Sequence, residues 1–222
     1  MKTDKMKREK KPWPTKDAMV QIYEKNLWGG KNADFYSGTG SHQTDLVEPY
    51  ICAVSSFLGS FDDSLVVCDL GCGDFNVGRR LVKHAKKYIA ADIVPGLIER
   101  NKRKFRADNL EFRCMDIAAE EWPSGDCVIL RQVLQHLSNA EIQRIVNKLA
   151  VFRYVILTEH LPEGDFIPNK DIISGQGTRL KINSGVNLQV PPFDFRAKRE
   201  KRLTAIPSRE DKGELVTILF ET

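Results

Sequence analysis

An acidic residue and two glycines stand together in Asp69-Leu70-Gly71-Cys72-Gly73, directly after the apolar run Leu65 to Cys68. Glycine carries no Cβ atom, so the backbone can bend sharply there and approach a ligand closely. A short apolar, β-branched run of this kind is typical of a buried parallel strand. Two glycines after a strand also occur in ordinary strand-to-helix turns that bind no ligand. The residues that follow must therefore distinguish a ligand-binding turn from an ordinary one.

Two further acidic residues come at the expected ends of strands. Asp92 ends the run Tyr88 to Ala91 and lies 21 residues after Gly71. In dinucleotide-binding folds an acid at the tip of the second strand, about 20 residues beyond the glycines, accepts hydrogen bonds from ribose hydroxyls. Asp116 follows a third run, Leu110 to Met115. These spacings predict a nucleoside site at the carboxyl ends of the strands.

The candidates for acid–base chemistry are histidines and one glutamate. Histidine is the side chain whose ordinary pKa suits proton transfer near neutral pH. His160 comes after the expected fifth strand and is the preferred general base, with Glu159 beside it as a rival. His136 follows the fourth strand, also on the ligand side, whereas His84 falls within a helical pattern. A structural role for any of these side chains stays open at this point.

Alternating strands and helices would position these residues. The apolar runs predict five strands, followed by two closing strands: 65–68, 88–92, 110–115, 126–130 and 154–158, then 202–206 and 215–220. Apolar residues at helical spacing predict helices over 16–26, 45–58 and 95–105, a helix from about Val77, and another after a capping box at Ser138. Residues 161–200 show no helical period, and we expect short strands near Ile182 and Leu188 there.

This order predicts an α/β fold with a doubly wound, mostly parallel seven-stranded sheet and an antiparallel C-terminal strand. We expect a disordered basic tail over residues 1–15 and a single domain over 16–222. Within that domain, residues 16–60 would form an N-terminal helical lid and residues 161–200 a substrate loop. The glycine-rich segment 35–42 would fold over the ligand, although a flexible connector is equally compatible with it.

Composition limits the function classes. The 222 residues are 41% hydrophobic and 29% charged, with a net charge of +4, which is ordinary for a globular protein. No apolar run reaches the roughly 20 residues of a membrane helix, and the charged N-terminus lacks the apolar core of a secretory signal. Five scattered cysteines show no metal-ligand spacing. We therefore expect a cytoplasmic protein with reduced thiols, no metal site and no membrane partner.

Four segments in register resemble the motifs of one family. Val66–Phe75, read as V-V-C-D-L-G-C-G-D-F, is similar to the first motif of class I S-adenosylmethionine-dependent methyltransferases, usually written D/E-x-G-x-G. Ala90-Ala91-Asp92 resembles the second acidic motif of that family, and Cys114–Ile117 its third. Ile129–Leu137 resembles the segment after the fourth strand, often V-L-x-H-L. The resemblance covers about residues 45–160 well and 200–222 loosely.

The resemblance implies a Rossmann-like fold, methyl transfer, S-adenosyl-L-methionine as the cofactor, and a set of residues that would hold it. Asp69 would bond toward the amino-acid end, Asp92 toward the ribose, and Asp116 toward the adenine amino group. The full set of expected cofactor residues is Asp69, Gly71, Gly73, Asp92, Ile93, Met115, Asp116, Ile117, Arg131 and Gln132. One departure concerns Phe75, where many members carry a third glycine, and Asn76 weakens a nicotinamide dinucleotide alternative, which would place a glycine there.

The acceptor is predicted from loops beyond the strand ends, which commonly bind substrate. We expect Arg179 to clamp a phosphate or carboxylate, Phe193 to wall the pocket and Tyr36 to contact the substrate from the lid. The leading hypothesis is a small-molecule or sugar-derivative acceptor, methylated at oxygen, with nucleic acid disfavoured. The alternatives left open are an RNA or protein methyltransferase that uses the basic tail, and a cofactor-binding module without activity.

Overall fold

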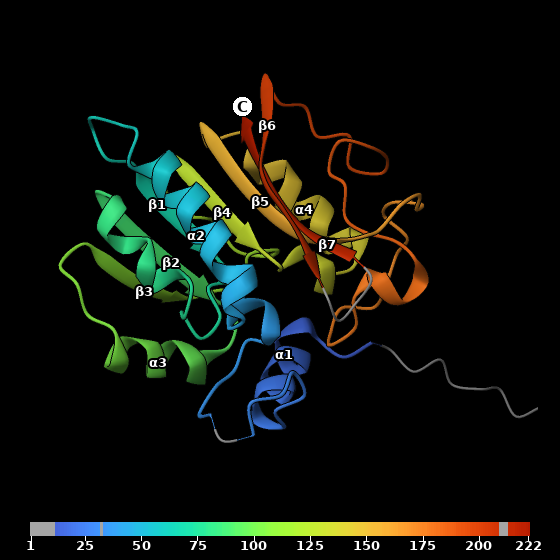
Figure 1. Cartoon of the computed structure of the whole chain (residues 1–222). Helices are drawn as coiled ribbons and strands as arrows, with labels where there is room; N and C mark the ends of the chain where they lie inside the picture. The colour runs from blue at the N-terminus through green and yellow to red at the C-terminus, as the bar shows by residue number, and fades with distance from the viewer. Residues whose placement is uncertain (1–11, 32, 209–212) are drawn as a thin grey trace, which may run out of the picture.

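A seven-stranded sheet organises the chain in the computed structural model, which describes residues 12–31, 33–208 and 213–222. The strands follow the order β3-β2-β1-β4-β5-β7-β6 (Figure 1). Their bounds are β1 Val66–Leu70, β2 Lys87–Asp92, β3 Leu110–Cys114, β4 Cys127–Arg131, β5 Tyr154–Pro162, β6 Arg199–Ser208 and β7 Gly213–Glu221.

The pairing confirms the predicted fold class. Strands β1 to β5 run parallel, whereas β7 pairs antiparallel with both β5 and β6. The chain order reverses at β1, between its neighbours β2 and β4. Such a reversal opens a crevice at the carboxyl ends of the strands, and open α/β sheets bind ligands there.

Helices cover both faces of the sheet, as the apolar periodicities predict. The helices are α1 Thr15–Glu24, α2 Thr44–Leu58, α3 Pro95–Lys104 and α4 Asn139–Leu149. Figure 1 shows α2 on the near face, α4 behind the sheet and α1 below the strand ends. Two separate apolar clusters fill the layers, one under α2 and the other under α1 and α4. The Ser138–Glu141 capping box starts α4 as predicted.

The segment after the glycine turn differs from the prediction. The helix expected from Val77 is replaced by two short 3₁₀ turns, η2 Gly78–Arg80 and η3 Val82–His84. A Cβ atom on Gly78 would lie 2.7 Å from the Asp69 carboxylate and 2.5 Å from the Phe75 ring. The backbone is therefore drawn close to β1, and its bonds close over three residues instead of four.

Residues 163–198 also differ, because none of them lies in a strand. The strand expected near Ile182 is the 3₁₀ turn η5 Arg179–Ile182, and Leu188 packs into the α4-side core. Side-chain bonds order this segment instead of a ladder: Asn169 Nδ2 donates to the carbonyls of Asn187 and Pro191. Strand β5 is longer than predicted, so Glu159 and His160 lie within it and pair with β7.

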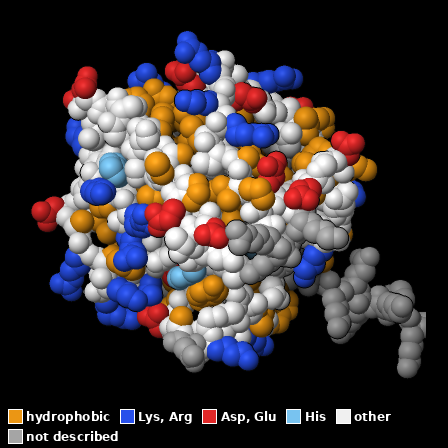
Figure 2. All heavy atoms as spheres, in the orientation of Figure 1, with side chains coloured by type: hydrophobic (Ala, Val, Ile, Leu, Met, Phe, Trp, Pro, Cys, Tyr) orange, Lys and Arg blue, Asp and Glu red, His pale blue; other side chains and the backbone are white. Residues whose placement is uncertain are grey.

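Charged side chains are spread over the surface. Figure 2 shows that Lys and Arg side chains gather at the lower left of this face, on the side where α3 lies in Figure 1. The last turn of α3 carries Lys102, Arg103 and Lys104, as expected for a solvated outer face. Within the described ranges, no helix has the length and apolar character needed to cross a membrane. Most of the predicted basic tail, residues 1–11, lies outside the described residues, and Thr15 already begins α1.

Candidate cofactor and acceptor site

One cavity of about 500 Å³ lies at the carboxyl ends of β1 to β5. All ten residues expected to hold the cofactor line it: Asp69, Gly71, Gly73, Asp92, Ile93, Met115, Asp116, Ile117, Arg131 and Gln132. Its volume falls in the range typical of sites for small organic ligands. The strand register brings these residues together, because parallel strands end at the same edge of the sheet.

Asp92 and the glycine turn form the centre of the cavity. The Gly73 amide donates to Asp92 Oδ2 at 3.1 Å, and the Val94 amide donates to Oδ1 at 3.0 Å. Gly71 and Gly73 have φ values of 88° and 56°, in the left-handed region that favours glycine. Burial raises the pKa of the Asp92 carboxyl to about 6, although both amides favour the charged form. This carboxylate is therefore poised to accept hydrogen bonds from hydroxyl groups of a ligand.

Asp69 lies deeper, beneath the same turn. The Tyr88 hydroxyl donates to Asp69 Oδ2 at 2.9 Å. Burial raises the pKa of the Asp69 carboxyl to about 7, and the Tyr88 bond opposes that rise. A buried carboxylate beside a cavity favours a cationic or hydrogen-bond-donating ligand group, which would restore the charged form.

Residues after β3 shape the opposite end of the cavity. Met115 and Ile117 are buried apolar side chains that line the wall. The Ala118 amide donates to Asp116 Oδ1 at 2.8 Å, which fixes that carboxylate at the rim. An apolar wall with one fixed carboxylate can hold an aromatic ring that carries an amino group.

Arg131, the last residue of β4, connects the cavity to the N-terminal segment. Its Nη2 donates to the Gly40 carbonyl at 2.6 Å and its Nη1 to Gln132 Oε1 at 3.1 Å. Gly40 lies against Gln132 so closely that a Cβ atom would meet Oε1 at 2.3 Å. The segment 37–41 therefore borders the cavity directly, in the position expected of a lid.

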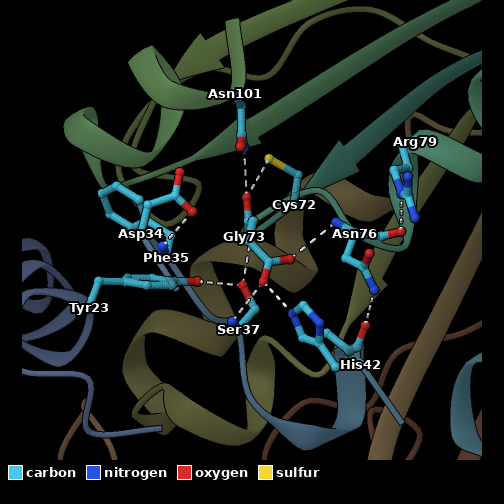
Figure 3. Close-up of polar contacts among 12 residues, drawn as sticks. Tyr23, Asp34, Phe35, Ser37, His42, Cys72, Gly73, Asn76, Arg79 and Asn101 are labelled. Carbon is cyan, nitrogen blue, oxygen red and sulfur yellow. Dashed lines mark hydrogen bonds and ion pairs between the residues drawn. The ribbon is translucent and has the colours of Figure 1, made fainter. Parts of the chain in front are cut away.

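The residues that hold segment 37–41, the predicted lid, in place were not identified from the sequence. Asp74, which is buried, accepts hydrogen bonds from the Ser37 amide and from His42 Nε2, and its own amide donates to Ser37 Oγ. Asn76 Nδ2 donates to the Ser41 carbonyl at 2.8 Å. Figure 3 shows Ser37, His42 and Asn76 converging beside Gly73. The sequence signal that could have indicated this attachment is the position of two polar residues, Asp74 and Asn76, directly after the glycine turn.

The three catalytic candidates occupy different environments. His160 lines the cavity at the β5 and β7 side, together with Leu215. His136 also lines it, but burial lowers the pKa of its imidazole to about 4, and Nδ1 bonds to the Gly177 carbonyl. Glu159 does not reach the cavity. Its carboxylate accepts from the Leu134 and Gln135 amides and so caps the 3₁₀ turn η4 Leu134–His136.

The three residues expected to bind substrate do not line the cavity. Arg179 is 1% exposed, and its guanidinium donates to the carbonyls of Lys170, Leu134 and Leu137. Phe193 packs into the apolar cluster beneath α4. The Tyr36 ring stacks on His42, with centroids 4.3 Å apart. These side chains already have hydrogen-bond or packing partners within the protein. They therefore stabilise the loops around the site and do not face a substrate.

The lining as a whole fits an adenosyl cofactor that carries an amino acid. Carboxylates stand where hydroxyl, amino and ammonium groups would need acceptors, and the glycine turn leaves room for close approach. Three buried polar atoms of residues that line the same cavity, Tyr50 Oη, Arg131 Nε and Gln135 Oε1, have no hydrogen-bond partner within the described part of the chain. Orphaned polar atoms in a cavity are typical of a ligand site.

Comparisons with known proteins agree with this geometry. Residues 67–152 match the family model described as "Methyltransferase domain". This range contains the glycine turn, Asp92, Asp116 and the segment after β4. No curated protein sequence matches the chain at a significant level.

Solved structures of similar fold span nearly the whole chain. The N-methyltransferase NodS from Bradyrhizobium japonicum WM9, in complex with S-adenosylhomocysteine, is 15% identical, with 92% of this chain and 99% of that chain covered and a TM-score of 0.68. Magnesium protoporphyrin IX methyltransferase from Synechocystis PCC 6803, with bound S-adenosylmethionine, is 16% identical, with coverages of 96% and 100% and a TM-score of 0.57. The 1,6-didemethyltoxoflavin-N1-methyltransferase of Burkholderia thailandensis is 10% identical, with coverages of 93% and 86% and a TM-score of 0.61. At these identities the similarity concerns the fold.

Proposed function

We propose that this chain, which carries a class I S-adenosylmethionine-dependent methyltransferase domain, transfers the methyl group to an oxygen atom of a small molecule or sugar derivative. The domain is defined by the four motifs, the sheet order and the family-model match. The observation that carries the proposal is one cavity that joins all ten expected cofactor residues and continues past β4 to His160. Two of the similar structures are methyltransferases named for small-molecule substrates, magnesium protoporphyrin IX and 1,6-didemethyltoxoflavin.

In this proposal the cavity residues divide the cofactor between them. Asp92 accepts from the ribose hydroxyls, and the wall of Met115 and Ile117 holds the adenine ring, with Asp116 at its amino group. Asp69 and the glycine turn face the amino-acid end. The lid that Asp74 and Asn76 hold in place keeps water from the reacting atoms, which is the contribution expected of a closed site.

The chemical step needs alignment and one proton acceptor. When bound, the cofactor would supply an electrophilic methyl group on a positively charged sulfur, with neutral S-adenosylhomocysteine as the leaving group, and the cavity residues would align an acceptor oxygen with that methyl group. A hydroxyl acceptor must also lose its proton, for which a general base within hydrogen-bond reach is worth about 10²–10⁴ in rate. We assign this role to His160, since His136 is held neutral by burial and bonded to Gly177.

The experiment offers S-adenosylmethionine with an isotopically labelled methyl group to an unfractionated cell extract and to its small-molecule fraction, and follows both labelled product and S-adenosylhomocysteine. His160→Gln is expected to lower kcat about 100-fold or more while the affinity for S-adenosylhomocysteine stays unchanged. His84→Gln, at a 3₁₀ turn outside the cavity, serves as the matched control. Label that appears only in protein or RNA would contradict the small-molecule acceptor, and full activity of His160→Gln would contradict the base.

A further inference from the structure

Charged side chains that line the cavity are segregated by sign. The carboxylates lie over β1, β2, β3 and α4: Asp69, Asp74, Asp92, Asp116 and Glu141. The half over β4, β5 and η5 is lined by Arg131, His160 and Lys181, and no carboxylate of the described residues lines it. A cationic cofactor suits the first half. The second half presents the positive charges of Arg131 and Lys181, with the His160 imidazole between them in the lining, to whatever binds beside the cofactor.

Arg131, at the end of β4, interacts electrostatically with the carboxylates of Asp69 and Asp74 but forms no direct ion pair with either. None of the described carboxylates lies within ion-pair distance of its guanidinium. Its bonds go to neutral acceptors on Gly40, Ser41 and Gln132. Its Nε has no partner, although a buried charge is costly unless it is paired.

Tyr50 of α2 stands next to this guanidinium. The Arg131 Cζ atom lies 4.8 Å from the centroid of the Tyr50 ring. Tyr50 is 1% exposed, and its hydroxyl also lacks a partner among the described residues. Two adjacent buried donors that border one cavity and find no acceptor in the protein are arranged to receive an acceptor from a ligand.

His160 and Lys181 line the cavity between Arg131 and its opening to solvent. Arg131 pairs in register with Thr158, and His160 lies two residues further along β5, on the same face of the sheet. Lys181, in η5, is exposed at the rim. Arg131, His160 and Lys181 therefore line the same cavity, with Lys181 at its exposed rim.

We propose that the methyl acceptor carries an anionic group, a carboxylate or a phosphate, which binds at Tyr50 and Arg131 after entering past Lys181. This proposal rests on the proposed function and adds the chemical class of the acceptor. An anionic oxygen satisfies both orphaned donors and neutralises the buried guanidinium, and hydrogen bonds to charged groups are the strong ones. The carboxylate of the cofactor is the competing source of the same chemistry, and a separate arm of the experiment distinguishes it.

The first arm separates the small-molecule extract on an anion exchanger and assays each fraction for S-adenosylhomocysteine formation. We expect the activity in the retained, anionic fraction. Phosphatase treatment of that fraction abolishes the activity if the group is a phosphate and leaves it intact if it is a carboxylate. Activity confined to the unretained fraction overturns the proposal. Absence of activity in every fraction, with intact S-adenosylmethionine binding, is a failure of the proposed function instead.

The second arm uses variants with the active fraction. Tyr50→Phe removes only a hydroxyl that has no protein partner, so folding is expected to be unimpaired while kcat/KM for the acceptor falls about tenfold or more. Lys181→Met is expected to raise KM several-fold, and Lys201→Met, an exposed lysine of β6 outside the cavity, is the charge-matched control. An unchanged kcat/KM in Tyr50→Phe overturns the assignment.

The third arm locates the anion. S-adenosylhomocysteine carries a carboxylate, whereas 5′-methylthioadenosine lacks the amino acid altogether. If Arg131→Met weakens both ligands by the same small factor, which the loss of its bond to Gly40 would produce, the anion belongs to the acceptor. A loss of tenfold or more for S-adenosylhomocysteine alone assigns the subsite to the cofactor and overturns the proposal.

Discussion

Single side chains set the chemistry of the proposed site, and Asp92 is the one whose ionisation we expect to be coupled to ligand binding. Its carboxylate is held by two backbone amides yet buried, which raises its pKa to about 6. Ribose hydroxyls that donate to it favour the charged form. Binding must therefore lower this pKa and release a proton when the pH is near or below 6.

The corresponding prediction is a pH-dependent affinity. The association constant for S-adenosylhomocysteine is expected to fall as the pH drops through 6, since protonated Asp92 accepts poorly. Calorimetry between pH 5 and 8, in two buffers of different ionisation enthalpy, measures both the constant and the released proton. Asp92→Asn should abolish the proton release that comes from the Asp92 carboxyl when the ligand binds. An affinity that rises on acidification would contradict the assignment.

Phe75 shows how a departure from the family pattern is accommodated. Its φ of 63° lies in the left-handed region that favours glycine, and its fully buried ring packs against Tyr88, Phe105 and Phe112. A left-handed residue costs about 1–2 kcal/mol, whereas a buried phenyl ring contributes more.

Restoring the glycine should therefore destabilise the protein. Phe75→Gly is expected to lower the free energy of unfolding by roughly 2–4 kcal/mol, because the lost ring outweighs the relief of backbone strain. Urea denaturation measures the change. An equal or higher stability of the variant would show that the ring contributes little to the core.

Sequence patterns placed the predicted cofactor residues in one cavity but not the predicted acceptor residues, for a physical reason. Asp69, Asp92 and Asp116 follow apolar runs, and the ends of parallel strands coincide in space. Arg179 was expected to bind substrate, yet its guanidinium satisfies backbone carbonyls around η4, a match that only the folded chain reveals. Tyr50 lies at a core position in the four-residue period of α2. The sequence pattern therefore predicts only a packed ring and gives no sign that its hydroxyl borders the cavity.

At the level of elements, Arg179 joins η5 to the segment that carries His136. We expect Arg179→Met to lower the free energy of unfolding by about 3 kcal/mol, because several buried carbonyls lose a charged donor. Thermal or urea unfolding measures this change, with Arg103→Met on the exposed side of α3 as the control. Unchanged stability together with a raised KM for the acceptor would return Arg179 to a substrate-binding role.

The lid is a second element whose attachment can be tested. Asp74→Ala removes the acceptor for the Ser37 amide and His42, and the loop should open more often. We expect faster hydrogen exchange over residues 36–43 and a dissociation rate of S-adenosylhomocysteine at least about tenfold higher. Asp62→Ala, an exposed change in the loop after α2, is the control. Exchange that is unchanged in Asp74→Ala would show that the lid is held by other contacts.

Elements were predictable where a simple period governs them. The helices α1 to α4 and the closing strands β6 and β7 follow from spacing and capping. The helix expected from Val77 fails because close contact of Gly78 with Asp69 and Phe75 overrides the local pattern. Residues 163–198 are ordered by Asn169 and Arg179, whose bonds join residues far apart in the sequence and so leave no periodic signal.

For the molecule as a whole, the sheet order accounts for a single cavity in which we propose that both cofactor and acceptor bind. The reversal at β1 places four of the five lining carboxylates over β1 to β3, with Glu141 on α4 as the fifth, whereas Arg131 and His160 lie on β4 and β5. The topology was predictable, because alternating strands and helices leave few arrangements. The division of charge was not, since it depends on which side chains face the same cavity.

The central claim is that the cavity binds S-adenosylmethionine through the carboxylate of Asp92. Isothermal titration of S-adenosylmethionine and S-adenosylhomocysteine into the wild type and Asp92→Ala tests it most directly. We predict saturable, one-to-one binding by the wild type and an affinity at least about tenfold lower in the variant, since two hydrogen bonds to a charged group are lost. Absence of binding by the wild type, or equal affinities for the two proteins, would contradict the claim.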